Sequence, residues 1–428
     1  MEIALVILFV GLIAIGVPIA FSLGIVAYTG IALIPALPRV VVFVRMFHGL
    51  NSFVLLAVPL FILAANIMNQ GKISQKLINF SLSLVGHIRG GLAHANILVS
   101  MFFAGVSGSS QADTAGVGKI LIPSMEESGY DKETAVGVTA ASSTIGSIIP
   151  PSIVMVVYAG ISNTPVSALF LAGIVPGVLV GLSMMAVVYA VALRKNFPKV
   201  DAIDFRKIWQ HFKESLPALL TPVIIVGGIV TGFYTATEAA AFACLYALII
   251  GLFVYKTIRL RDLPTILIDT LKLSSLSLFA LATASALGQL MAHYQISRII
   301  FDFFSGSALG TGAFVGIIVL FFLFIGTFMD GIPAMILFVP VILPSARALG
   351  IDPVHLGIIV TMTLSMGLVT PPYGLCLLIA ASISNITIER AFRGTLPYFM
   401  VAVATLLLVA FFPDIVLTIP RLLMPSLF

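Results

Sequence analysis

Sixty consecutive residues of this chain, from 134 to 193, contain no Asp, Glu, Lys or Arg. A helix that crosses a bilayer needs about 20 apolar residues, so this stretch alone is long enough for at least two crossings. Over the whole chain only 9% of the residues are charged, whereas a soluble domain carries about 25%. The apolar runs are continuous, without the alternating polarity of a membrane β-barrel. The sequence therefore predicts an all-α polytopic membrane protein.

The chain also contains two copies of one sequence unit, at residues 102–163 and 323–384. The copies align without a gap at an offset of 221 residues (344 − 123). Matched positions are Gly105 with Gly326, Pro123-Ser124 with Pro344-Ser345, Gly129 with Gly350, Asp131 with Asp352, Gly146 with Gly367, and Pro150-Pro151 with Pro371-Pro372. Glycines and prolines that stay in register over such a length indicate a duplicated structural unit.

The first part of each copy predicts a re-entrant helical hairpin, over about 95–132 and 313–350. An apolar stretch is interrupted near its middle by small and polar residues. Non-helical backbone at membrane depth is tolerated only inside protein or beside a water-filled cavity. At the tips, Ser110–Asp113 and Thr327–Asp330 have the spacing of a capping box, which would make both acids helix caps.

The second part of each copy predicts a transmembrane helix broken in its middle, over about 134–160 and 354–382. Both carry a Gly followed by a double Pro, in SSTIGSIIPPS (142–152) and LSMGLVTPPYG (364–374). Two prolines remove two backbone donors, and the residue before a proline is disfavoured in helical geometry. The helix should therefore unwind before the prolines and restart with a proline in its first turn. An ordinary proline kink is the alternative.

These breaks and tips offer ligands for a cation and an anion together. Unwound carbonyls with Ser or Thr hydroxyls suit Na⁺, and helix N-termini suit a carboxylate. A site that binds both is the physical basis of cation-coupled anion uptake. The rival ion is H⁺, whose coupling usually needs a buried carboxylate or histidine. In the mid-depth regions of the two copies only Asp113 and Asp330 are acids.

The duplication divides the chain into a first inverted repeat at 1–194, a linker at 195–215 and a second inverted repeat at 216–428. Residues 194–215 carry six of the 22 Lys and Arg residues, which favours the cytoplasmic side. Their pattern is compatible with an amphipathic helix on the membrane surface. Inversion of the second repeat places Lys256, Arg259 and Arg261 outside, against the charge trend. We expect about 10–12 crossings, including a short one near 295–307.

Other features exclude several classes of function. The net charge of +5 fits loop residues that orient the protein in the membrane, and we expect no nucleic-acid partner. Cys244 and Cys376 lie far apart in apolar runs, which excludes a disulfide framework and a CxxC metal site. The histidines show no HExxH spacing, and we expect His94 and His293 to be satisfied structural residues. Glu238 fits a helix start capped by Thr235 and Thr237.

Five stretches taken together resemble the large membrane subunit of the tripartite ATP-independent periplasmic (TRAP) transporters, over essentially the whole chain: GVSGSSQADTAGVGKILIPSM, GSIIPPS, GGIVTGFYTATEAAAFA, FMDGIPAMILFVPVILP and GLVTPPYG. The resemblance implies a Na⁺-driven secondary importer of carboxylated organic anions in a bacterial inner membrane, working by an elevator mechanism. Substrates in this family include C4-dicarboxylates, sialic acids and other sugar acids. It also implies two protein partners, a small four-helix membrane subunit and a periplasmic substrate-binding protein.

The resemblance further implies two Na⁺ sites, each between a hairpin tip and the neighbouring broken helix. The first would use Gly105, Ser107 and Ser109 with the backbone of Ser142–Gly146, and the second Gly326, Thr327 and Asp330 with the backbone of Gly367–Thr370. The substrate would lie between the sites, near Ser143, Thr144, Pro151, Thr370 and Pro372. Ser109 aligns with Asp330 (109 + 221 = 330), so the two cation sites need not be chemically equal.

Three other functions compete with this interpretation. A channel would equilibrate its solute, so uphill accumulation would exclude it. A membrane-embedded enzyme would need a nucleophile with its base or a metal cluster, and the sequence offers neither at a recognisable spacing. A standalone Na⁺/dicarboxylate symporter with a similar inverted-repeat core would work without a small membrane partner.

Overall fold

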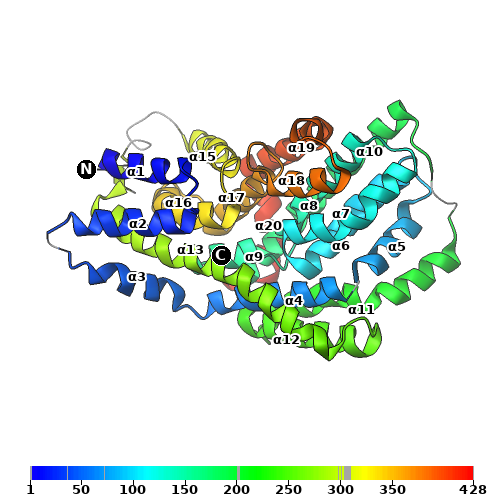
Figure 1. Ribbon diagram of the computed structural model, residues 1–428, viewed down its shortest axis with the longest axis horizontal. Helices are drawn as coiled ribbons and strands as arrows, with labels where there is room; N and C mark the ends of the chain where they lie inside the picture. Colours follow the sequence, from blue (N-terminus) through cyan, green and yellow to red (C-terminus); the bar gives the residue numbers. More distant parts are fainter. Residues whose placement is uncertain are drawn as a thin grey trace.

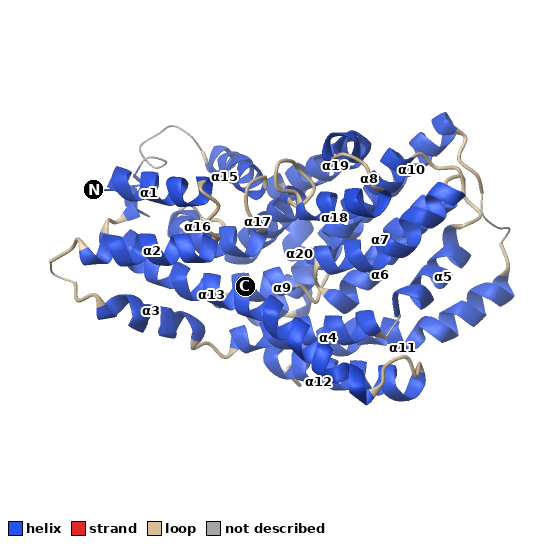
Figure 2. Cartoon of the chain, viewed as in Figure 1, coloured by secondary structure: helices blue, strands red, loops and turns tan. Residues whose placement is uncertain are grey.

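The computed structural model describes residues 2–35, 37–71, 73–199, 203–296, 298–299, 301–302 and 310–427. Within these ranges the regular elements are helices and none is a strand (Figure 2), which confirms the all-α class. The first half contains α1 (Glu2–Ala14), α2 (Ile19–Ala32), α3 (Val40–Leu50), α4 (Ala57–Gln70), α5 (Ile73–Val85), α6 (Gly91–Ser107), α7 (Ser110–Glu127), α8 (Lys132–Ser143), α9 (Ile153–Ser162) and α10 (Val166–Lys195). The second half contains α11 (Phe205–Val230), α12 (Ala236–Ile249), α13 (Leu263–His293), α15 (Thr311–Gly326), α16 (Gly331–Ala348), α17 (Pro353–Gly367), α18 (Leu375–Ser384), α19 (Ile388–Phe411) and α20 (Pro413–Leu423).

Six helices in the described ranges are long and apolar enough to cross a membrane by themselves. The segments 40–50 and 54–70 would form a seventh span, bent by 69°. Seven further apolar helices have only 10–17 residues, below the length of a simple crossing. The chain is therefore a polytopic membrane protein. Most of the short helices are arms of hairpins or halves of broken helices.

Each sequence copy folds into a hairpin followed by an interrupted helix. In the first copy, α6 and α7 are joined by a tip at 108–109, and α8 continues through a 3₁₀ turn (Thr144–Ser147) to a break before α9. In the second copy, α15 and α16 are joined by a tip at 327–330, and α17 breaks over 368–374 before α18. The peptide bonds between the paired prolines are cis in both breaks.

The two copies also share their local turn chemistry. Asp131 caps α8 by accepting a hydrogen bond from the Thr134 amide, and Asp352 caps α17 by accepting one from the Val354 amide. Gly129 and Gly350 precede these caps with φ of 88° and 77°, the left-handed region that glycine adopts without strain. The duplication is thus visible in the backbone, residue by residue at the same offset.

Replacing Asp131 with Ala should lower the free energy of unfolding by about 1 kcal/mol, because α8 loses its N-terminal cap. The ion pair of Asp131 with Lys195 Nζ (2.9 Å) is partly exposed and adds little. Thermal unfolding of the purified variant in detergent measures the loss. Asp131→Asn is the matched control, because asparagine caps equally well. An equal loss in both variants would assign the effect to the ion pair with Lys195 instead.

The polar segment between the repeats does not form a separate helix on the membrane surface. α10 reaches Lys195, and α11 begins at Phe205 and runs for 26 residues. Residues 205–215 are therefore the first turns of a long, otherwise apolar helix, and the loop is limited to 196–204, of which 200–202 lie outside the described residues. The crossing expected near 295–307 also falls mostly outside them.

The hairpins and broken helices lie at the centre of the molecule. Every residue from Thr134 to Ser143 in α8 and from Val354 to Gly367 in α17 is buried, the Ser and Thr residues included. The α6–α7 hairpin extends to the right in Figure 1 and the α15–α16 hairpin to the left, so their tips meet near the middle. α13 packs against α2, α3 and α4 on the outside and against α16.

The structure confirms the expected role of Glu238 and contradicts the expectation for His94. Thr235 and Glu238 form a capping box at the start of α12, which confirms the structural role of Glu238, although Thr237 donates instead to the Phe53 carbonyl. His94 is buried, and its Nε2 has no hydrogen-bond partner among the described residues. The expectation that His94 is satisfied was therefore wrong, because the helices packed around it bring no donor or acceptor to that atom.

Candidate functional site

The first hairpin tip packs directly on the break between α8 and α9. The Ile153 amide, at the restart of the helix, donates a hydrogen bond of 3.3 Å to the Gly108 carbonyl. Gly146, just before the break, lies against the tip: a Cβ there would be 3.2 Å from the carbonyl atoms of Ser109. The hydroxyls of Ser110 and Ser147 meet at 2.6 Å. The tip and the break thus form one continuous junction.

The second tip makes an equivalent junction with the break between α17 and α18. The Tyr373 amide donates a hydrogen bond of 3.0 Å to the Thr327 carbonyl. Gly326 and Gly367 touch through their backbones, because a Cβ on Gly367 would lie 2.6 Å from the Cα and carbonyl atoms of Gly326. Thr370 donates to the Gly367 carbonyl at 2.9 Å. Both copies therefore hold carbonyls and hydroxyls together at a tip-to-break contact.

The helix caps at the tips differ from the predicted capping boxes. α6 ends at Ser107 and is followed by Gly108, whose φ is 62°, so Ser109 becomes the N-cap of α7 and accepts from the Ala112 amide. Asp330 is the N-cap of α16 and accepts from the Gly331 amide at 2.8 Å. Thr327 keeps helical geometry at the end of α15. The predicted box at Ser110–Asp113 was therefore wrong, and Asp113 is not a cap. In the second tip the expected cap by Asp330 is confirmed, although Thr327 is not its partner in a box.

The corrected cap leaves Asp113 without a partner. It is 0% exposed on α7, and neither carboxylate oxygen accepts a hydrogen bond from the described residues. The hydroxyls of Ser100 and Ser143 are the polar groups directed towards it. Ser100 donates instead to Ser142, and Ser143 donates to the Thr139 carbonyl. A buried carboxyl group with no donor is costly unless a proton or a cation joins it.

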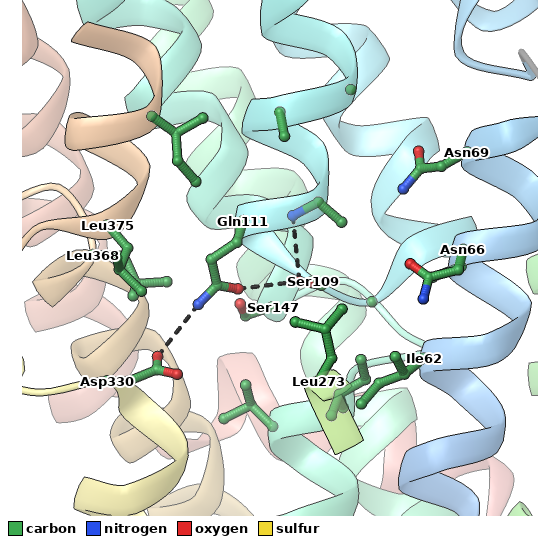
Figure 3. A pocket seen from close by; sticks show the side chains of 18 of the residues that line it. Ile62, Asn66, Asn69, Ser109, Gln111, Ser147, Leu273, Asp330, Leu368 and Leu375 are labelled. Carbon is green, nitrogen blue, oxygen red and sulfur yellow. Dashed lines mark hydrogen bonds between the residues drawn. The ribbon is translucent and has the colours of Figure 1, made fainter. Parts of the chain in front are cut away.

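A side chain that the sequence analysis did not select joins the two tips. Gln111 Nε2 donates to Asp330 Oδ1 at 3.3 Å, and Ser109 Oγ donates to Gln111 Oε1 at 3.1 Å (Figure 3). Gln111 therefore connects Ser109 with Asp330, which occupy aligned positions in the two sequence copies. In the sequence, the only sign of this role is that Gln111 lies inside the tip, two residues after Ser109.

A cavity of about 1140 Å³ opens between the tips. Ser109, Gln111 and Asp330 line it from the hairpins, while α4 and α13 form the opposite wall (Figure 3). Ser147 and Tyr373 reach it from the two breaks. Its volume is slightly above the roughly 300–1,000 Å³ of the clefts that bind small organic ligands. The wall from α4 and α13 was not predicted.

The candidate residues fall into three groups in the structure. Ser109 with Gly146, and Gly326 with Gly367, meet at the junctions, where Thr327 and Asp330 also lie. Ser107, Ser142, Ser143, Thr144, Pro151 and Thr370 are buried and do not line the cavity, and Pro372 is exposed outside it. Gly105 faces α11, because a Cβ there would lie 2.8 Å from Pro222. The structure thus brings residues of the hairpin tips into contact with glycines of the helix breaks. It does not gather the expected substrate residues around the cavity.

The chain is similar to known transport proteins along nearly its whole length. The family model described as the tripartite ATP-independent periplasmic transporter, DctM component, matches residues 5–415. The sialic acid TRAP transporter large permease protein of Vibrio cholerae is 38% identical, over 96% of this chain and 96% of the relative. The C4-dicarboxylate TRAP transporter large permease protein of Pseudomonas aeruginosa is 38% identical, over 88% of each chain.

A solved structure shows the same fold at low sequence identity. The Alcanivorax borkumensis YdaH transporter superposes with a TM-score of 0.60 at 16% identity, over 86% of this chain and 87% of that one. At that level of identity the likeness concerns the fold, and it agrees with a polytopic membrane protein.

Proposed function

Because the chain belongs to the family of DctM components of tripartite ATP-independent periplasmic transporters, we propose that it is the large permease of a Na⁺-driven importer of carboxylated organic anions. The observation that carries this proposal is the pair of equivalent junctions, each with a hairpin tip on a helix break. The homologues are permeases for sialic acid and for C4-dicarboxylates, and both are carboxylated anions. An importer that uses an ion gradient needs one site for the ion and one for the anion, and we assign the ion to the junctions and the anion to the cavity.

The chemistry of the junctions supports Na⁺ as the coupling ion. Backbone carbonyls and hydroxyls are the oxygen ligands that discontinuous helices offer to Na⁺ in transporters. The first junction provides Ser109 and the backbone around Gly146, and the second provides Thr327, Asp330 and the backbone around Gly367. Asp330 adds a carboxylate to the second junction, where the aligned residue Ser109 adds only a hydroxyl, so the second junction should bind the cation more tightly.

The packing supports movement of the hairpins and broken helices as one body. Within each copy the tip and break are hydrogen-bonded together, and Gln111 connects the two copies. Around them stand long apolar helices such as α11 and α13, whose outward faces carry exposed large hydrophobic side chains that suit lipid. We propose that the central body slides against these helices in an elevator mechanism, carrying the cavity across the membrane.

Two protein partners complete the proposed transporter. A small four-helix membrane subunit would pack on the outer helices, and a periplasmic substrate-binding protein would deliver the anion from outside. We propose that this complex lies in the inner membrane of a bacterium. The Lys and Arg residues of the linker between the repeats favour the cytoplasmic side for that linker.

Uptake into proteoliposomes tests this function. The vesicles contain this chain with its small membrane subunit, and the external solution contains a radiolabelled anion with or without the substrate-binding protein. Accumulation should require both an inward Na⁺ gradient and the binding protein. Accumulation without the binding protein would instead identify a standalone symporter, and equilibration without any gradient would identify a channel.

A second coupling ion is favoured by one observation, the unpaired carboxyl group of Asp113. Buried carboxylates of this kind serve as proton carriers in other transporters. An inward pH gradient without Na⁺ should drive no uptake if the junctions bind Na⁺ and Asp113 is structural. Uptake driven by the pH gradient alone, and lost in Asp113→Asn, would replace Na⁺ by H⁺ in the proposal.

A further inference from the structure

Gln111 is held in one orientation where the two hairpin tips meet. Ser109 Oγ donates to its Oε1 at 3.1 Å, and its Nε2 donates to Asp330 Oδ1 at 3.3 Å (Figure 3). An ionised carboxylate only accepts hydrogen bonds, so the amide must turn its nitrogen towards Asp330. Because both ends are engaged, the side chain is ordered before any ligand binds, which lowers the entropic cost of binding to it.

One amide hydrogen of Gln111 remains available for a ligand. A glutamine amide carries two N–H donors, and Nε2 makes a single hydrogen bond within the described part of the chain. Gln111 lines the cavity together with Ser109 and Asp330. The N-termini of α7 and α16 are already capped by those two side chains, so they offer an anion little. The second N–H of Gln111 is therefore a fixed donor at the tips.

The carboxylate beside this donor has no positive charge next to it. Asp330 Oδ1 accepts from Gln111 and from the Gly331 amide at 2.8 Å, and Oδ2 accepts no hydrogen bond from the described residues. Within the same ranges Asp330 forms no ion pair. Lys119 is the cationic side chain of the described cavity lining. It follows Gln111 by eight residues of α7, which is about 12 Å along the helix.

Asp330 therefore sets a condition on any anion that uses the donor. A ligand carboxylate bound to the second N–H would share one amide group with Asp330, and like charges so close together disfavour each other. A cation on Asp330 would remove this repulsion, because its charge compensates that of the carboxylate. The second junction, where Asp330 lies, is also a place to which the proposed function assigns Na⁺. Binding of the ion and of the anion would then be linked reciprocally, each strengthening the other by the same factor.

We propose that Gln111 couples the ion to the anion: its free amide hydrogen binds the carboxylate of the transported anion, and does so only when Na⁺ neutralises Asp330. This rests on the proposed function and adds the residue that carries its coupling. Without Na⁺, the charge of Asp330 keeps the anion away from the tips. With Na⁺ bound, Asp330 no longer repels the anion and still holds the amide in the orientation that the anion needs.

Equilibrium binding with and without Na⁺ tests the proposal. The complex of this chain with its small membrane subunit is placed in nanodiscs, and the dissociation constants of radiolabelled N-acetylneuraminate, a sialic acid, and succinate, a C4-dicarboxylate, are measured in Na⁺ and in choline. An anion that binds the wild type should bind at least about fivefold more tightly in Na⁺, the lower end of the usual coupling between two sites. Absence of binding by both anions in Na⁺ would refute the anion site in the cavity, and this proposal with it.

Asp330→Asn isolates the charge. Asparagine caps a helix as well as aspartate does, and its amide oxygen can still accept from Gln111, whereas the negative charge is lost. In this variant the anion should bind in choline nearly as tightly as it binds the wild type in Na⁺. An anion affinity that depends on Na⁺ as strongly as in the wild type would contradict the role given to Asp330.

Gln111→Leu isolates the donor. The anion affinity in Na⁺ should fall by about tenfold or more, since a hydrogen bond to a charged group is lost. The affinity for radioactive Na⁺ in the absence of any anion should not weaken, whereas a tip that had merely lost its structure would bind both ligands less tightly. Gln75→Leu is the matched control, because Gln75 lines the cavity from α5, where it donates to Asn79, and it should keep both affinities. Unchanged anion affinity in Gln111→Leu would overturn the proposal.

The same measurements separate this proposal from the proposed function. Binding that depends on Na⁺ but is unchanged in Gln111→Leu would refute the role of Gln111 and leave Na⁺-driven import standing. Binding that is equally tight in Na⁺ and in choline, yet weaker in Gln111→Leu, would refute the coupling to Na⁺ and leave Gln111 as a donor to the anion.

Discussion

Replacing Gly367 with Ala should strongly reduce Na⁺-driven uptake while the protein still inserts into the membrane. The added methyl group would overlap the backbone of Gly326, and neither backbone can rotate away as a side chain would. Overpacking of this kind costs about 1–3 kcal/mol, and the local response is to push the second tip off the helix break. Because the proposed second Na⁺ site consists of that contact, we expect uptake to fall by at least about tenfold.

Two glycines serve as matched controls. Gly146→Ala places a methyl group 3.2 Å from the Ser109 backbone at the first junction, a distance that a small shift can relieve, so uptake should fall less. Gly227→Ala in α11 meets nothing within 4 Å and should leave uptake unchanged. The measurement is the initial rate of uptake in proteoliposomes, normalised to the amount of inserted protein. Wild-type uptake by Gly367→Ala would show that the backbone contact is not part of the transport site.

Replacing Asp330 with Ala should reduce Na⁺-driven uptake by about tenfold or more, because the second junction loses its only carboxylate ligand for the cation. Stability should fall by only about 1 kcal/mol, the usual effect of losing an N-cap. The loss of the hydrogen bond from Gln111 (3.3 Å) also separates the two tips. Uptake as a function of Na⁺ concentration, together with thermal unfolding, measures both effects.

Asp352→Ala is the control for this prediction. Asp352 is also an aspartate N-cap, at the start of α17, but it lies outside the tips and the cavity lining. It should lose a similar amount of stability and keep its Na⁺ dependence. If the two variants lost uptake equally, the effect of Asp330 would be one of helix capping and the proposed cation ligand would be refuted. Ser109→Ala should also reduce Na⁺-driven uptake, by its effect on the first junction, but less than Asp330→Ala does.

The all-helical class and the approximate positions of the hairpins and helix breaks could be predicted from the sequence. Charge-free runs and paired prolines act locally, through solvation and backbone donors, and can therefore be read along the chain. The details at the tips were not predictable in this way. Whether Ser109 or Ser110 caps α7 depends on the left-handed turn at Gly108, and that one-residue shift is what leaves Asp113 without a donor.

Contacts between distant segments could not be predicted from the sequence, for a different reason. Gln111 meets Asp330, and Asn66 meets Thr270, across more than two hundred residues of chain. No local pattern encodes these pairs, because they depend on how the repeats and the outer helices pack. The cavity wall from α4 and α13 was missed for the same reason, as was the continuation of the polar segment 205–215 into α11.

The most direct test of the central claim, one Na⁺ at each junction, is the Na⁺ concentration dependence of uptake in the wild type and in Asp330→Ala. Two coupled sites allow a Hill coefficient of up to about 2, and we predict a value clearly above 1 in the wild type. Removal of the second site should lower it to about 1. A coefficient that does not change between the two proteins, or uptake that needs no Na⁺ in either, would contradict the account.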